Sequence, residues 1–127
     1  MIPKDAILRV ARPTDHLEAI TKMYIEGLGY DLLGTFNGEF SGSIVGHRNH
    51  PYHLEFTSHI SEKVGLAPSR EHLLVFYIPD DVEYMEAVKR VTTSGFKKVE
   101  PFNPYWENDA QTFEDLDGYG VVIANYK

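Results

Sequence analysis

The chain has 127 residues, of which 43% are hydrophobic and 13% aromatic, enough for one compact folding unit or for two small halves that share a core. The absence of cysteine excludes disulfides and thiolate sites, while the net charge of −7 and the scattered Lys and Arg residues disfavour nucleic-acid binding. The apolar runs are far shorter than the roughly 20 residues that cross a bilayer, and no signal-peptide pattern opens the chain, so we expect a cytoplasmic protein without a membrane or nucleic-acid partner.

The first half of the chain predicts a strand, a helix and three further strands. The segment ILRVA at 7–11 is strand-like. Thr14 or Asp15 can cap the helix that follows, because either side chain accepts hydrogen bonds from free first-turn N–H groups. Gly27 and Gly29 predict where this helix ends. Its apolar stripe comprises Leu17, Ile20, Met23, Tyr24 and Leu28. The further strand candidates are residues 30–37, 43–47 and 52–58.

The second half predicts the same order of elements. The segment HLLVFYI at 72–78 is the strand, Asp80 or Asp81 caps a helix, and Gly95 ends it. The apolar stripe of this helix comprises Val82, Met85, Val88 and Val91. The further strand candidates are residues 96–101, 110–114 and 119–125. The segment PFNPYWEND at 101–109 contains two prolines and predicts a loop.

The two halves are an internal repeat. A shift of 66 residues superposes four pairs of apolar or turn-forming residues: Leu8 on Leu74, Pro13 on Pro79, Asp15 on Asp81 and Gly29 on Gly95. We therefore predict an α+β fold of two β-α-β-β-β modules, the first at about 5–60 and the second at about 70–125, which form one domain over 1–127.

One strand carries an unusual polar face. In the segment 50–59, His53 and Glu55 alternate with apolar residues, so both side chains lie on the same face of a sheet. That face can simply meet water, or it can line a cleft in which Glu55 binds a ligand or a metal. Residues near this strand add His47 and His50, in or near loops, as side chains that could reach such a site.

The order and spacing of five motifs resemble the vicinal oxygen chelate superfamily, which includes glyoxalase I, extradiol dioxygenases, and fosfomycin- and bleomycin-resistance proteins. The motifs are LRV at 8–10, LGY at 28–30, HLEFT at 53–57, HLLVFYIPD at 72–80 and DLDGYGVVI at 115–123. The resemblance covers nearly the whole chain. It implies that the modules form a curved, incompletely closed barrel around a cleft, and that the protein is a homodimer.

The same resemblance implies where metal ligands would stand. Metal-dependent members take one ligand from the first and one from the last strand of each module. In this chain the positions fall on Asp5, or Ala6 if the register slips, and on Glu55, His72 and Val122. Glu55 and His72 are chemically suitable, whereas Val122 cannot bind a metal.

Arg9 and Trp106 are further candidates for ligand contacts. The resemblance implies that Arg9 faces the cleft, where its guanidinium needs an anionic partner, either Glu55 or an anionic ligand. Trp106 and Tyr105, in the proline-bounded loop, could stack on a ligand or simply pack the loop onto the sheet.

Two functions remain open at this point. The first is a metal-independent small-molecule binding protein with no cofactor, whose cleft offers Arg9, His53, Glu55, His72 and Trp106 to the ligand. The alternative is a glyoxalase-like lyase or an extradiol-dioxygenase-like enzyme with one divalent metal (Zn, Ni, Mn or Fe) on Glu55 and His72, in which Glu55 is the catalytic candidate. A third possibility is a cleft that has become purely structural.

Overall fold

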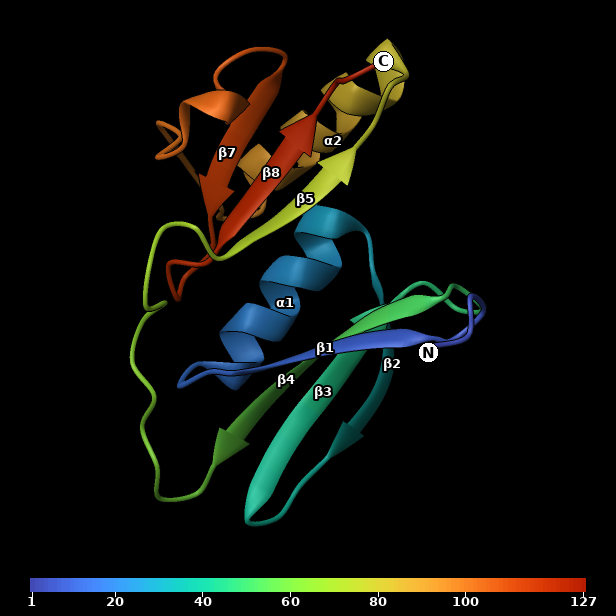
Figure 1. Cartoon of the computed structure of the whole chain (residues 1–127). Coiled ribbons are helices and arrows are strands. Elements are labelled where there is room, and N and C mark those ends of the chain that lie inside the picture. Colours follow the sequence, from blue (N-terminus) through green and yellow to red (C-terminus); the bar gives the residue numbers. More distant parts are fainter.

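The computed structural model describes residues 1–127 and shows two β-α-β-β-β modules joined by a linker at 60–72 (Figure 1). Module one consists of β1 (Leu8–Pro13), α1 (Leu17–Leu28), β2 (Asp31–Phe36), β3 (Phe40–Gly46) and β4 (Tyr52–His59). Module two consists of β5 (Leu73–Tyr77), α2 (Asp81–Thr93), β6 (Lys97–Val99), the short 3-10 helix η1 (Pro104–Trp106), β7 (Ala110–Glu114) and β8 (Gly120–Ala124). The predicted repeat is confirmed. Neither helix has the length and apolarity needed to span a membrane.

Each module forms its own four-stranded mixed sheet. The strand orders are β1-β4-β3-β2 and β5-β8-β7-β6. In each sheet the first strand pairs in parallel with the last, and the other pairs are antiparallel. The sheets share no strand pairing, so neither closes, and β1 and β5 each have a free edge. The predicted α+β class is confirmed.

The helices bring the two modules together. Helix α1 packs on β3 and β4, α2 packs on β8, and the two helices pack against each other. Figure 1 shows α1 lying between the strands of its own module and β5 of the second. The shared core contains aromatic side chains from both modules, with Tyr24 between Phe56 and Phe96 at ring distances of 4.9 and 5.3 Å. Burial of these rings fixes the relative position of the modules.

The two helices begin differently. Asp80 caps α2 as predicted, because its carboxylate accepts the N–H of Glu83 at 2.9 Å. The prediction that Thr14 or Asp15 caps α1 is wrong, since α1 begins after His16 without a side-chain cap. Asp15 instead accepts the N–H groups of Val64 and Gly65 in the linker.

The two glycines at the end of α1 also have different roles. Gly29 follows the helix at φ 73°, a left-handed conformation that favours glycine, and it ends α1 as predicted. The prediction that Gly27 ends the helix is wrong. Gly27 lies inside α1, where an added Cβ would come within 2.5 Å of the Phe96 ring. Its small size therefore allows α1 to approach module two.

The buried stripe of α2 and the start of β3 differ from expectation. Val88 and Val91 pack on the core as predicted, but Val82 and Met85 are exposed. Tyr84 and Ala87 take their place. Strand β3 begins at Phe40, three residues earlier than position 43, because the hairpin turn is shorter than the polar segment suggested.

A buried polar network joins the modules beneath β1. Arg12 donates to Asp115 at 2.9 Å and to the Tyr24 hydroxyl at 2.9 Å, and Tyr24 donates to Asp115 at 2.6 Å. Nearby, Thr14 donates to Asp117 at 2.6 Å, and the His16 ring lies 3.0 Å from the same carboxyl group. The Asp115 side chain is fully buried, so Arg12 supplies the charge that this carboxylate needs.

Candidate functional site

An ion pair stands on the face of the first sheet that α1 does not cover. Arg9 on β1 donates to the Glu55 carboxylate on β4 at 3.2 Å. The side chains are 45% and 20% exposed, so solvent reaches both. Leu54 and Phe56, which alternate with Glu55, are buried in the core on the other face. We call this the Arg9–Glu55 face.

Histidines flank the ion pair along β4. His53 stands beside Arg9 in the strand register and two residues before Glu55, on the same face. His59, further along the same face, lies 3.0 Å from Glu39 and packs edge-on against Phe40. The face therefore offers one guanidinium, one carboxylate and imidazole nitrogens to a small molecule.

The other predicted site residues lie elsewhere. Asp5 was expected in the first strand, but β1 begins at Leu8, so Asp5 precedes it and is exposed. His72 immediately precedes β5 on the second sheet, with Nδ1 3.0 Å from the Ser69 hydroxyl and its ring against Tyr119. Within one chain, Glu55 and His72 thus belong to different sheets.

Trp106 lies over the second sheet. Its ring stacks on Tyr126 at 5.9 Å and contacts Tyr77 of β5 and the ring of Tyr105. The loop that carries Trp106 leaves β6 at one edge of the sheet and reaches β5 at the other. Trp106 and Tyr105 therefore pack with aromatic residues of module two.

The second sheet has an apolar face where the first has charges. Val122 is completely buried although it alternates with the core residues Val121 and Ile123. It pairs with Val75 and Thr112, and Phe102 of the overlying loop shares a small cavity with Thr112. The loop thus covers this face, where Val75 and Val122 are apolar and the buried Thr112 hydroxyl has no hydrogen-bond partner, so no charged pair stands here.

No group of three or more His, Asp or Glu side chains in this chain has an arrangement that could hold a metal ion. Glu55 is already paired with the Arg9 guanidinium. Along β4, the one other side chain close to Glu55 that could bind a metal is His53. Structural or catalytic metal sites need three or four donors at matching distances.

Reasoning from the sequence missed the inter-module network of Arg12, Tyr24 and Asp115. Burial raises the pKa of Tyr24 well above its ordinary value, so the phenol stays protonated and donates to Asp115. A signal was present, because Arg12 is in phase with Leu8 and Val10 on the core-facing side of its strand. A charged residue in an apolar phase indicates a buried partner.

A larger cavity, of about 460 Å³, lies between the modules beside the free edge of β5. Its walls are mostly apolar, with Leu28, Phe76 and Ile78 among them. Tyr30 and Tyr52 share a hydrogen bond of 2.9 Å at its border, and burial raises the pKa of Tyr30. The cavity therefore suits apolar groups better than charges.

The chain is similar to the uncharacterized protein YycE of Bacillus subtilis (strain 168). The two are 39% identical over 125 residues, which cover 96% of this chain and 89% of the relative. A crystal structure of a B. subtilis YycE protein, of unknown function and provisionally described as a glyoxalase/fosfomycin resistance protein, matches with a TM-score of 0.87 at 37% identity. The match covers 98% of this chain and 92% of that one.

More distant structures share the fold alone. The fosfomycin resistance protein FosX of Mesorhizobium loti matches with a TM-score of 0.74 at 13% identity, over 100% of this chain and 94% of that chain. A glyoxalase I mutant of Zea mays matches with a TM-score of 0.74 at 16% identity, over 95% of this chain and 45% of that chain.

Family models cover both modules. The YycE-like N-terminal domain matches residues 8–57, and the YycE-like C-terminal domain matches residues 71–125. The fold neighbours among glyoxalases and fosfomycin resistance proteins agree with the motifs in the sequence. The chain therefore belongs to the YycE-like family, within the vicinal oxygen chelate superfamily.

Proposed function

We propose that this protein binds a small molecule without a metal, on the Arg9–Glu55 face. The observation that carries the proposal is the 3.2 Å contact between the Arg9 guanidinium and the Glu55 carboxylate. A metal ion on Glu55 would stand close to this guanidinium, and two cations that share one carboxylate repel each other. Arg9 thus neutralises the best candidate ligand of a metal site.

The ligand that fits this face carries an acidic group and a hydrogen-bond donor. Arg9 is nearly half exposed and can turn part of its planar fork towards a carboxylate or phosphonate. Glu55 can then accept from a hydroxyl or amino group of the same ligand. His53 adds a third polar contact on the same strand.

A second copy of the chain would complete the site. Ile7, Leu8 and Val10 are large apolar side chains that stay exposed at or beside the free edge of β1. The apolar cavity beside the free edge of β5 offers a surface of matching character. Exposed apolar edges of this kind favour association, so we propose a homodimer in which the second copy covers the Arg9–Glu55 face.

A metal-dependent lyase or dioxygenase is the second candidate. It is favoured by the presence of His53 and Glu55, two side chains able to bind a metal, on the same face of one strand. In this case the partner subunit's His72 would supply a further ligand, and Arg9 would have to leave Glu55.

Ligand screening tests the first proposal. A thermal-shift screen of small carboxylates, phosphonates and hydroxy acids, with excess chelator present, should yield compounds that raise the melting temperature. Calorimetry of each hit should show that Arg9→Met and Glu55→Gln each weaken binding by about tenfold or more, the usual effect of removing a charged hydrogen-bond partner.

The matched control is Arg48→Met, which removes an arginine from the loop between β3 and β4, outside the Arg9–Glu55 face. It should bind the ligand like the wild type. Hits that bind only with added metal, or that bind equally to Arg9→Met, would overturn the proposal.

A further inference from the structure

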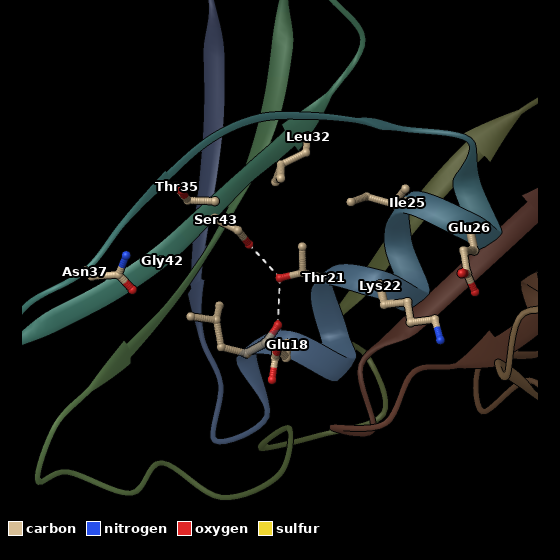
Figure 2. Close-up of a pocket in the computed structure, with 11 residues that line it drawn as sticks. Glu18, Thr21, Lys22, Ile25, Glu26, Leu32, Thr35, Asn37, Gly42 and Ser43 are labelled. Carbon is tan, nitrogen blue, oxygen red and sulfur yellow. Dashed lines mark hydrogen bonds between the residues drawn. The ribbon is translucent and has the colours of Figure 1, made fainter.

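A groove runs between α1 and β2 on the helix-covered side of the first sheet, and its cavity volume is about 440 Å³ (Figure 2). Helix α1 packs on β3 and β4, so the outer strand β2 is left largely uncovered on this side. Figure 2 shows side chains of the helix and of the strands approaching the groove from opposite walls. None of its lining residues belongs to the Arg9–Glu55 face.

An irregularity in β2 keeps the groove open. Leu32 pairs with Val45 while Gly34 pairs with Ile44, so one extra residue lies between them. The extra residue increases the distance along the strand between Leu32 and Thr35, the two residues of β2 that line the groove. Space remains where regular alternation would have placed a closer side chain.

The helix wall has two parallel rows of side chains at spacings of four residues. The inner row is Leu17, Thr21 and Ile25, and the outer row is Glu18, Lys22 and Glu26. No ion pair within 4.0 Å involves the outer row. The border of the groove therefore carries two carboxylates and one ammonium group, an excess of one negative charge.

The floor of the groove presents a free hydrogen-bond acceptor. The Thr21 hydroxyl donates its single proton to the carbonyl of Leu17 at 2.6 Å, because a carbonyl can only accept. The Ser43 hydroxyl, 2.6 Å from Thr21, must therefore be the donor in that contact (Figure 2). Because Ser43 donates in this contact, both of its lone pairs remain, and neither accepts a hydrogen bond within the chain, so Ser43 Oγ can accept from a ligand.

We propose that this groove binds a small primary amine with a short apolar tail. The ammonium group donates to Ser43 Oγ and is attracted by Glu18 and Glu26, while the tail packs between Leu32 and Ile25. The site goes beyond the proposed function, because a ligand here touches neither Arg9 nor Glu55. An anionic ligand would meet an acceptor and an acidic border, and is disfavoured.

The test compares three probes of equal length: n-hexylamine, n-hexanol and sodium hexanoate. Each is titrated into the full-length ¹⁵N-labelled protein at pH 7. Hexylamine should shift the amide signals of Thr21, Leu32 and Ser43 with a saturable Kd of about 1–10 mM, as its few non-hydrogen atoms allow. Hexanol should bind several-fold more weakly, and hexanoate should give no saturable shift at these residues.

Two variants check the polar contacts. Ser43→Ala should weaken hexylamine binding by about tenfold, and a double variant with Glu18→Gln and Glu26→Gln should bind hexylamine and hexanol equally. Two matched controls should bind like the wild type. They are Ser41→Ala, on the same strand outside the groove, and Glu86→Gln, at an exposed position of α2. The surface double variant keeps the test valid if Ser43→Ala fails to fold.

Several results would overturn the proposal. Binding of hexanoate or hexanol at the groove as tightly as hexylamine would exclude an amine site. Hexylamine shifts confined to other parts of the protein, or no saturable shift with any probe, would also exclude it. A wild-type affinity in Ser43→Ala would show that the floor does not accept a hydrogen bond from the ligand.

Discussion

Arg9 and Arg12 stand three residues apart on β1 and point to opposite faces of the same sheet. Arg12 reaches across to module two, where its side chain is 15% exposed and its partner Asp115 is fully buried. Arg9 pairs with Glu55 inside module one, where both side chains are open to solvent. The residue type and the kind of partner are the same, and only the environment differs.

The difference indicates which arginine stabilises the fold and which is available to contact a ligand. A buried carboxylate that loses its cation strongly destabilises the folded state. An exposed pair contributes little to stability, because water solvates both charges and screens their attraction. We therefore assign the Arg12 pair to the joining of the modules and propose that the Arg9 pair recognises the ligand.

The largest expected effect comes from Arg12→Met. It leaves the Asp115 carboxylate buried without its cation and removes one partner of the Tyr24 hydroxyl. The free energy of unfolding should fall by about 3–5 kcal/mol, as measured by urea denaturation. A loss below about 1 kcal/mol would show that Arg12 and Arg9 do not differ as described.

The next effect concerns the apolar face of module two. Val122→Glu places a carboxylate where the side chain is completely buried, so the free energy of unfolding should fall by about 2–4 kcal/mol. No zinc binding should result, as judged by calorimetry. If instead the variant keeps wild-type stability and takes up zinc, the second sheet has an accessible face and the contrast with the first fails.

Arg9→Met should have a small effect on stability and a large effect on ligand binding. We expect a change of less than about 1 kcal/mol in the free energy of unfolding, because the pair is exposed. Binding of the acidic ligand, measured by calorimetry, should weaken by about tenfold or more. A destabilisation as large as that of Arg12→Met would instead make the Arg9–Glu55 pair structural.

The smallest effect is local and involves the linker between the modules. The N–H groups of Gly65 and Val64 hold the pKa of Asp15 below its ordinary value of 3.8. The stabilisation is therefore present above pH 3.8 and is lost as the pH falls through the lower pKa of the folded state. Amide exchange at Val64 and Gly65 should accelerate over that acidic range.

A substitution tests the contact between Asp15 and the linker at neutral pH. Asp15→Ala should increase trypsin cleavage after Lys63 by about threefold or more, because the linker loses its hydrogen bonds to module one. Asp81→Ala is the matched control, since the pKa of Asp81 is also lowered, here by its hydrogen bond with Lys127 far from the linker. Cleavage at Lys63 should not change in this control.

The modules could be predicted from the sequence because their signals are local. Apolar spacing, an Asp near the helix start and a glycine near the helix end recur at a shift of 66 residues, and signals of this kind act through neighbouring backbone groups. Asp80 and Gly29 perform as local chemistry predicts. Asp15 does not cap, because a tertiary partner, the linker, binds its carboxylate instead.

The site was only partly predictable, since it depends on strand register and long-range contacts. The choice between a ligand and Glu55 as the partner of Arg9 required the register of β1 against β4. The exact start of β1, which leaves Asp5 outside the strand, has no sharp sequence signal. The partner of Arg12 lies 103 residues away, beyond the range of any local pattern.

The central claim is that Glu55 pairs with Arg9 and not with a metal. The most direct test is elemental analysis of the protein purified without a metal-affinity tag and then incubated with Zn, Ni, Mn or Fe. We predict less than about 0.1 equivalent of any of these metals per chain after desalting, because the donor set is incomplete. About one equivalent that is lost in both Glu55→Ala and His72→Ala would contradict the account and establish a metal site on these residues.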